Sequence, residues 1–287
     1  MKPAACFLGI SAIAAALVLC SSDSRSELKP QEKSAPRTYL GFDLNFFPGS
    51  AALPVLRKNF SFSGYWLSPP PGEKTNTWRG KRELMEKAGF GFLLLYRGRQ
   101  SAELKSETDA TRKGTLDARN AASNAKSEGF VSKSVLFLDI EEGGRLPGTY
   151  HAYLHAWTTE LIRLGYRAGA YCSGIPVKEE GAVTITTADD IRSHLSSQDF
   201  VFFIYNDACP PSPGCVFPDS PPPPSASGTS YAEIWQFAQS PKRKQFAAHC
   251  PPGYDTDGNC YAPGDTAHAW FLDVSTASTP NPSGASK

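Results

Sequence analysis

The sequence lacks an excess of charge of either sign. Its 287 residues include 29 Lys and Arg against 28 Asp and Glu, which leaves a formal net charge of +1. No dense stripe of Lys and Arg occurs along the chain either. A protein that binds nucleic acid or another polyanion needs a concentrated positive surface. The composition therefore argues against nucleic acid as a partner, and the 40% hydrophobic content suits one large domain.

Long hydrophobic runs are also scarce. The apolar run at residues 4–20 follows Met1 and Lys2, and it is too short and too rich in alanine to span a bilayer stably. A basic start followed by a short apolar run is typical of a secretory signal. We therefore predict a signal peptide over residues 1–22 and a flexible polar leader over residues 23–37. The mature protein would be secreted, periplasmic or part of the cell envelope.

The end of this run leaves membrane attachment open. Cys20 has the place of a lipidated first residue of a mature lipoprotein, but Leu19 stands where such signals want a small residue. One alternative is a lipid on Cys20 that attaches the protein to a membrane. The other is cleavage shortly after Cys20, which releases a soluble protein. We expect a monomer.

Cysteines are few, and after removal of the signal their number is odd. In an oxidising compartment one thiol should then stay free. Cys209 and Cys215 bracket a proline-rich loop, and Cys250 and Cys260 bracket a loop rich in glycine and proline. We predict these two local disulfides. Cys172 lies inside an apolar strand pattern and should be buried and inert.

A glycine-rich phosphate-binding turn is missing after the first predicted strand, which argues against an open doubly wound sheet, the alternative fold. Short and nearly continuous apolar runs recur along the chain, as in strands covered on both faces. Eight strands are predicted, at residues 39–47, 60–67, 90–98, 134–141, 166–173, 200–206, 231–239 and 269–275. Eight strands in about 240 residues match a single parallel (β/α)8 barrel of the TIM type, an α/β fold.

Amphipathic segments separate several of these strands, as a barrel of alternating strands and helices requires. We predict helices at residues 78–88, 116–128, 150–164 and 188–195. The last third holds two loops rich in proline and glycine, so some helices there should be degenerate. The barrel is predicted to cover residues 38–278, followed by a disordered tail at residues 279–287.

Acidic residues occur where several predicted strands end. In parallel barrels the reactive groups lie at the carboxyl ends of the strands. The first strand ends with Asp43, the fourth with Asp139 and Glu141, and the eighth with Asp273. Side chains alternate along a strand, so Asp139 and Glu141 should face the same cavity. Two close carboxylates repel each other, and the one in the more apolar setting keeps its proton more readily.

A purely structural alternative exists for this pair. Asp139 and Glu141 could cap the strand or pair with Arg97 or Arg99 at the end of the third strand. Charges are rarely placed in a closed apolar layer without a use, which favours the functional interpretation. Glu142 is expected to point outward or into the loop.

Aromatic residues also occur near strand ends. A single buried ring is more often part of a core than a platform for a sugar. Six rings in equivalent positions favour a carbohydrate cleft, and these are Tyr65, Trp66, Tyr96, Tyr171, Tyr205 and Trp235.

Several sequence motifs, taken together and in their order, resemble those of a known protein family. The motifs are Gly41-Phe42-Asp43, the strand Ser63-Gly64-Tyr65-Trp66-Leu67, Leu138-Asp139-Ile140-Glu141, the segment at residues 165–171, Ile234-Trp235-Gln236 and Leu272-Asp273. The chain resembles the glycoside-hydrolase-like domain of secreted bacterial proteins, a domain of unknown function. That domain is similar to the family 25 glycoside hydrolases, which are muramidases with an Asp-x-Glu motif on strand four. The resemblance covers about residues 39–275.

The resemblance implies cleavage of a β-linked glycan, in cell-wall peptidoglycan or another polysaccharide. Glu141 would be the general acid and Asp139 the partner that positions or stabilises the cationic centre. Asp43 and Asp273 would be flanking carboxylates. Gln236 would join the aromatic residues in binding substrate. The long loops after residues 208 and 244 depart from the muramidase pattern, so the resemblance does not identify the substrate.

Three classes of function remain at this point. The first is an exported glycosidase, the second is a non-catalytic glycan-binding barrel, and the third is a structural envelope protein, against which the inward-facing Asp139 and Glu141 argue. We predict no cofactor and no metal centre. The stretch at residues 255–259 resembles half of a calcium loop, but the bidentate Glu is missing and a tight turn is the better interpretation.

Overall fold

The computed structural model describes residues 37–195, 199–206, 220–241 and 256–284. The predicted signal peptide, Cys20 and the predicted leader up to residue 36 lie outside the described residues. The described fold falls in one unit that extends from Pro36 to Lys287. Among the described residues, none of the helices combines the length and the hydrophobicity that crossing a membrane requires.

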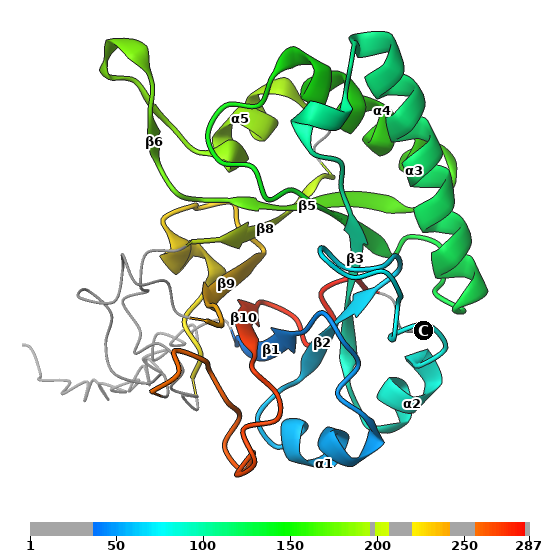
Figure 1. The fold of residues 1–287 in the computed structure, drawn as a ribbon, viewed down its shortest axis with the longest axis vertical. Coiled ribbons are helices and arrows are strands. Elements are labelled where there is room, and N and C mark those ends of the chain that lie inside the picture. Colours follow the sequence, from blue (N-terminus) through cyan, green and yellow to red (C-terminus); the bar gives the residue numbers. More distant parts are fainter. Residues whose placement is uncertain (1–36, 196–198, 207–219, 242–255, 285–287) are drawn as a thin grey trace, which may run out of the picture. The chain divides into compact units, whose positions relative to one another are not determined.

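Eight strands form a closed barrel in the order β1-β10-β9-β8-β5-β4-β3-β2 (Figure 1). They are β1 Tyr39–Asp43, β2 Phe62–Trp66, β3 Gly91–Arg97, β4 Val135–Asp139, β5 Arg167–Ser173, β8 Val201–Tyr205, β9 Ile234–Ala238 and β10 Asp273–Ala277. The two short strands β6 Val177–Lys178 and β7 Thr184–Ile185 form a separate antiparallel pair. The predicted TIM-type barrel is confirmed.

One strand runs against the prediction of an all-parallel barrel. β10 pairs antiparallel with both β1 and β9, while the other neighbours in the barrel are parallel. The strand also begins later than predicted, at Asp273. No helix lies between β9 and β10 in the part of the chain that the structure describes, and a strand that returns without a crossover helix can pair antiparallel.

Helices cover the outside of the barrel. They are α1 Leu53–Leu56, α2 Arg82–Lys87, α3 Glu107–Ser127, α4 Gly148–Arg163 and α5 Thr187–His194. Four short 3-10 turns complete the set, at Ser50–Ala52, Ser101–Glu103, Glu180–Ala182 and Pro224–Ser227. Among the described residues after β8, the only helical segment is the 3-10 turn at Pro224–Ser227. This agrees with the expected degeneration of helices in the last third.

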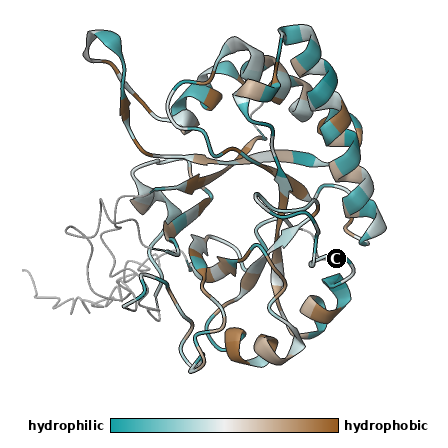
Figure 2. Ribbon diagram, viewed as in Figure 1, coloured by the Kyte–Doolittle hydropathy of each residue, from teal (hydrophilic) through white to brown (hydrophobic). Residues whose placement is uncertain are grey.

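The long helices α3 and α4 lie side by side (Figure 1) because α3 presents small residues to α4. A Cβ atom on Gly114 of α3 would lie 2.2 Å from the carbonyl oxygen of Tyr153, so only glycine permits this approach. Ser106 caps α3 by accepting a hydrogen bond from the Asp109 N–H at 3.2 Å. Figure 2 shows hydrophilic residues over much of α3 and hydrophobic residues along the central strands.

Large rings fill the barrel interior below its mouth. Phe62, Phe137 and Phe203 are buried and alternate with outward-facing residues along their strands. Glycines make room for two of these rings. A Cβ atom on Gly41 would lie 2.1 Å from the Phe62 ring, and one on Gly169 would lie 2.6 Å from the Phe137 ring. The interior at this level is therefore a packed core.

The predicted disordered tail is wrong for the described residues that follow β10. Ser283 is fully buried and bonds to two strands, since its N–H donates to the Phe92 carbonyl and its carbonyl accepts from the Val135 N–H. Asn281 also accepts a hydrogen bond from the Phe92 N–H at 2.8 Å. The pairing of β3 with β4 begins only at Leu94. The tail satisfies backbone groups that the two strands leave unpaired at their start.

Candidate functional site

Four carboxyl groups line one cavity of about 490 Å³ at the barrel mouth, and they are those of Asp43, Asp139, Glu141 and Asp273. Asp43 ends β1 and Asp139 ends β4, as predicted. Glu141 lies two residues beyond β4 and is exposed. The structure thus brings together the whole predicted acidic set.

Asp273 reaches the cavity for a different reason from the predicted one. It lies at the start of β10 and not at its end. Because β10 is antiparallel, its start lies at the same edge as the carboxyl ends of the other strands, and Asp273 is directly opposite Asp43. The Asp273 carboxylate accepts a hydrogen bond from the Ser240 N–H at 2.7 Å.

Asp139 is buried among like charges. Burial and, to a smaller extent, the negative charge of Glu141 raise the pKa of the Asp139 carboxyl to about 8, although Arg97 opposes both effects. Asp139 therefore carries a proton at neutral pH. The alternative pairing with Arg99 is not found, because the Arg99 guanidinium binds Asp117 through two hydrogen bonds of 2.7 and 2.9 Å.

Asp43 has a similar setting. Burial raises the pKa of the Asp43 carboxyl well above its ordinary value, the charge of Asp273 adds to this, and a hydrogen bond from Gln236 lowers it in part. That bond runs from Gln236 Nε2 to Asp43 Oδ2 at 3.1 Å. Two acids at the mouth therefore hold their protons more tightly than free aspartate does.

A network of polar side chains orients the Gln236 amide. The Tyr171 hydroxyl and the Gln239 Nε2 both donate to Gln236 Oε1, at 2.6 and 2.7 Å. With its oxygen engaged by two donors, Gln236 directs its NH2 group at Asp43. Gln239 was missed in the sequence analysis because the strand was predicted to extend to residue 239, where alternation places this side chain on the face opposite Gln236, whereas β9 ends at Ala238.

The backbone around Glu141 is held from several sides. The Tyr205 hydroxyl donates to the Glu141 carbonyl at 3.0 Å. Glu142 turns into the loop, where its carboxylate accepts from the N–H and the hydroxyl of Ser101. The Thr187 hydroxyl donates to the Glu142 carbonyl at 3.1 Å. The loop after β4 is therefore tied to β8, to the Ser101 turn and to α5.

Three of the six predicted aromatic residues line the cavity, and these are Trp66, Tyr171 and Tyr205. Tyr171 and Tyr205 stack on each other with ring centres 4.7 Å apart. Phe203, Leu95 and Asn45 also line the cavity and were not predicted. Asn45 follows Asp43 by two residues, so strand alternation could have identified it.

The other three rings do not line the cavity and are packed in the protein interior, which corrects the prediction. Tyr65 and Trp235 are each adjacent to a cavity residue on the same strand, and neighbours on a strand face opposite sides. The Tyr65 ring packs against Trp78, and its hydroxyl donates to Glu128 at 2.6 Å. Trp235 is 1% exposed, and Tyr96 packs against Trp157 of α4.

A second hollow of about 500 Å³ adjoins the first. Pro71, Asp139 and Glu141 line both, and the second is otherwise formed mainly by residues 97–102 with Arg97 and Arg99. The carboxyl pair therefore lies between two hollows.

The cysteine predictions are partly tested. Cys172 is free and buried, as predicted. Cys260 is disulfide-bonded. Cys209, Cys215 and Cys250 lie outside the described residues, so both predicted pairings stay predictions. In the calcium-like stretch, Asp257 accepts a hydrogen bond from the Asn259 N–H at 2.9 Å, as in a tight turn.

Comparison with known proteins adds a family and a fold. The family model of the Rv2525c-like, glycoside hydrolase-like domain matches residues 61–204, just over half of the chain. No curated protein matches. An uncharacterized B. stearothermophilus protein is 20% identical, with a TM-score of 0.53, over 83% of this chain and 95% of its own.

Two further solved structures are more distant. The Tat-secreted protein Rv2525c of Mycobacterium tuberculosis, in complex with L-tartrate, is 15% identical with a TM-score of 0.47, over 84% of this chain and 95% of its own. The spore cortex lytic enzyme SleM of Clostridium perfringens is 13% identical with a TM-score of 0.49, over 86% of this chain and 69% of its own.

Proposed function

The chain belongs to the Rv2525c-like, glycoside hydrolase-like domain family, and from this premise we propose that it is an exported enzyme that hydrolyses a β-linked glycan. The substrate would be cell-wall peptidoglycan or another polysaccharide. One observation carries the proposal, namely four carboxyl groups that line a single cavity together with aromatic rings. Hydrolysis of a glycosidic bond needs a proton donor and a second carboxyl group near the developing positive charge.

Glu141 is the proposed proton donor because it is the more exposed member of the pair at the mouth. Asp139 lies deeper and holds a proton at neutral pH. A protonated Asp139 can donate a hydrogen bond to a substituent of the sugar and so position it for cleavage. Transfer of that proton to Glu141 makes Glu141 the acid that protonates the leaving oxygen, and it leaves the Asp139 carboxylate to stabilise positive charge on the sugar ring.

The remaining groups of the cavity bind substrate in this proposal. Trp66, Tyr171 and Tyr205 offer apolar faces for sugar rings. Gln236, Gln239 and Asn45 offer amides for sugar hydroxyls. The second hollow beyond Asp139 and Glu141 gives space for sugars on the other side of the cleaved bond.

The proposal is tested by incubating the protein with peptidoglycan and with a panel of β-glucans. New reducing ends are measured for the wild type and for Glu141→Gln. We expect release by the wild type from at least one polymer and little release by the variant, which should still bind that polymer. Equal cleavage by both proteins would contradict the assignment of Glu141.

A glycan-binding barrel without turnover is the second candidate. The observation that favours it is the polar network of Asp43, Gln236 and Tyr171, which suits hydrogen bonding to hydroxyl groups without chemistry. Binding of one polymer without cleavage of any member of the panel would replace the enzyme by this function.

A further inference from the structure

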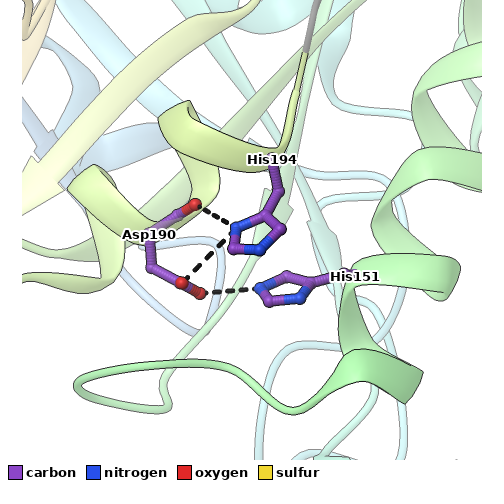
Figure 3. Close-up of side chains that lie close together, drawn as sticks. All are labelled: His151, Asp190 and His194. Atoms are coloured by element: carbon purple, nitrogen blue, oxygen red, sulfur yellow. Dashed lines mark hydrogen bonds and ion pairs between the residues drawn. The ribbon is translucent and has the colours of Figure 1, made fainter.

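Outside the barrel mouth, two histidines and a buried aspartate meet between helices α4 and α5 (Figure 3). His151 comes from α4, and Asp190 and His194 lie four residues apart on one face of α5. One possible ligand atom from each of the three lies within 4.8 Å of those of the other two. None of these residues lines the cavity with the four carboxyl groups.

The aspartate lies at the centre of the cluster. His151 Nε2 is 2.8 Å from Asp190 Oδ2, and His194 Nδ1 is 3.5 Å from Asp190 Oδ1. The two imidazole rings are stacked, with centres 3.7 Å apart and planes inclined by 17°. In Figure 3 the His151 ring is joined to the Asp190 carboxylate, and Nδ1 of His194 is joined both to that carboxylate and, at 2.8 Å, to the main-chain carbonyl oxygen of Asp190.

These distances are close to those of a metal site. Tetrahedral Zn²⁺ holds its ligands at roughly 2.0–2.2 Å, so that ligand atoms lie about 3.3 Å from one another. A rearrangement of the side chains, in which His194 Nδ1 leaves the Asp190 main-chain carbonyl, would bring the three atoms to that spacing. Two imidazoles and one carboxylate are a common donor set for zinc and other divalent transition metals, whereas magnesium and calcium prefer oxygen ligands.

Burial and access also suit a bound ion. The Asp190 side chain is fully buried, while those of His151 and His194 are 18% and 42% exposed. An ion can therefore enter from the histidine side, where water could complete its coordination.

Groups already present leave one carboxylate oxygen less occupied than the other. Asp190 Oδ2 accepts from His151 and, at 2.9 Å, from the Leu146 N–H. Asp190 Oδ1 has only the longer contacts of 3.5 Å to His194 and Arg145, and the Arg145 guanidinium binds mainly to Glu179. Oδ1 can bind a metal while Oδ2 keeps the Leu146 N–H, an arrangement that holds a ligating carboxylate in place.

We propose that His151, Asp190 and His194 form a binding site for one divalent transition metal ion, with Zn²⁺ the best fit. The ion joins α4 to α5. It also fixes the loop after β4, since Asp190 binds the Leu146 N–H and Thr187 of α5 binds the Glu142 carbonyl. The site is independent of the proposed glycosidase activity, although it supports the loop that carries Glu141.

The test uses the untagged full chain, freed of metal with a chelator and then dialysed. Zn²⁺ is added, and binding is followed by calorimetry, by metal analysis and by the melting temperature. We expect one Zn²⁺ per chain with a Kd of about a micromolar or lower, and a rise in melting temperature that grows with zinc concentration. Mg²⁺ should have no such effect.

Two variants locate the site. His194→Ala changes a partly exposed residue, and Asp190→Asn keeps an oxygen for the Leu146 N–H. Each should weaken Zn²⁺ binding at least tenfold and remove the thermal shift. His155→Ala, an exposed histidine on the same helix α4, is the matched control and should bind like the wild type.

Cobalt gives a second measurement that distinguishes histidine from cysteine ligands. Co²⁺ at this site should show visible absorption without the strong near-ultraviolet band of thiolate ligation. Absence of stoichiometric Zn²⁺ binding, unchanged binding in both variants, or a thiolate band with Co²⁺ would each overturn the proposal.

Discussion

Acidic residues at the barrel mouth lie beside other carboxyl groups, whereas acidic residues in the layer of helices are paired with arginines. Asp139 and Glu160 are both 7% exposed. Glu160 of α4 lies under two surface arginines, Arg163 and Arg119, whose hydrogen bonds lower the pKa of its carboxyl to about 2. Burial and the charge of Glu141 raise the pKa of Asp139 to about 8.

The difference shows that the charged groups near a buried carboxyl, and not its exposure alone, determine its pKa. Acids matched with arginine hold helices together, as Asp117 does with Arg99. Acids gathered without matching cations oppose folding, and such groups are typical of functional sites.

The largest effect should be on stability. The unfolded chain loses the Asp139 proton near pH 4 and the folded chain near pH 8, so the folded state loses stability as pH rises between these values. Asp139→Asn removes this cost. We expect the variant to exceed the wild type in free energy of unfolding above pH 8, by about 5 kcal/mol at most, with the gain vanishing near pH 4. Urea unfolding at several pH values measures it.

Asp117→Asn is the corresponding variant in the layer of helices, and its free energy of unfolding should change in the opposite direction. Asp117 is buried and accepts from Arg99 and from the Tyr153 hydroxyl. Its replacement should lower the free energy of unfolding by about 1.5–3 kcal/mol, since it weakens hydrogen bonds to a charged group. A higher free energy of unfolding in both variants, or a lower one in both, would contradict the contrast between the barrel mouth and the layer of helices.

Turnover of a glycan should also differ between a variant of the barrel mouth and a variant of the layer of helices. Glu141→Gln keeps the shape of the side chain but cannot donate the proton, so turnover on a cleaved glycan should fall roughly a hundredfold or more. Glu160→Gln, in the helix layer, should leave turnover unchanged at a temperature where it is folded. Initial rates at saturating substrate, with circular dichroism as the folding control, decide the matter.

A similar division applies to the aromatic rings. Trp66→Ala removes a ring that lines the cavity and should weaken glycan affinity by about 1–2 kcal/mol. Trp235→Phe alters a ring in the barrel packing and should leave affinity unchanged. Calorimetric titration with the polymer identified above compares them, and equal losses of affinity would contradict the division.

The smallest expected effect is on a single pKa. Glu141→Gln removes the negative charge that helps to keep the proton on Asp139, so the pKa of Asp139 should fall below 8 by about one unit. Carbon NMR of the labelled carboxyl group measures this change. An unchanged or higher pKa would mean that the two groups do not interact as described.

Local sequence patterns predicted some of the site residues correctly and misplaced others. Alternation along the fourth predicted strand was enough to place Asp139 and Glu141 on the same face, and the positions of Asp43 and Asp273 at strand ends predicted that they join the pair. Alternation also shows that Tyr65 and Trp66 cannot both face the cavity. The error with Tyr65 and Trp235 came from counting rings near strand ends without applying that rule to each strand.

Runs of apolar residues and the residues that end them are local properties, so they were enough to predict the barrel, its acidic mouth and the buried free Cys172. The antiparallel direction of β10 and the binding of the tail between β3 and β4 could be seen only in the folded protein. The tertiary structure also decided which acid is protonated and brought His151 to Asp190. These features depend on neighbours far apart in the chain, and a carboxyl pKa or a metal site depends on all groups within a few ångströms, whatever their distance in sequence.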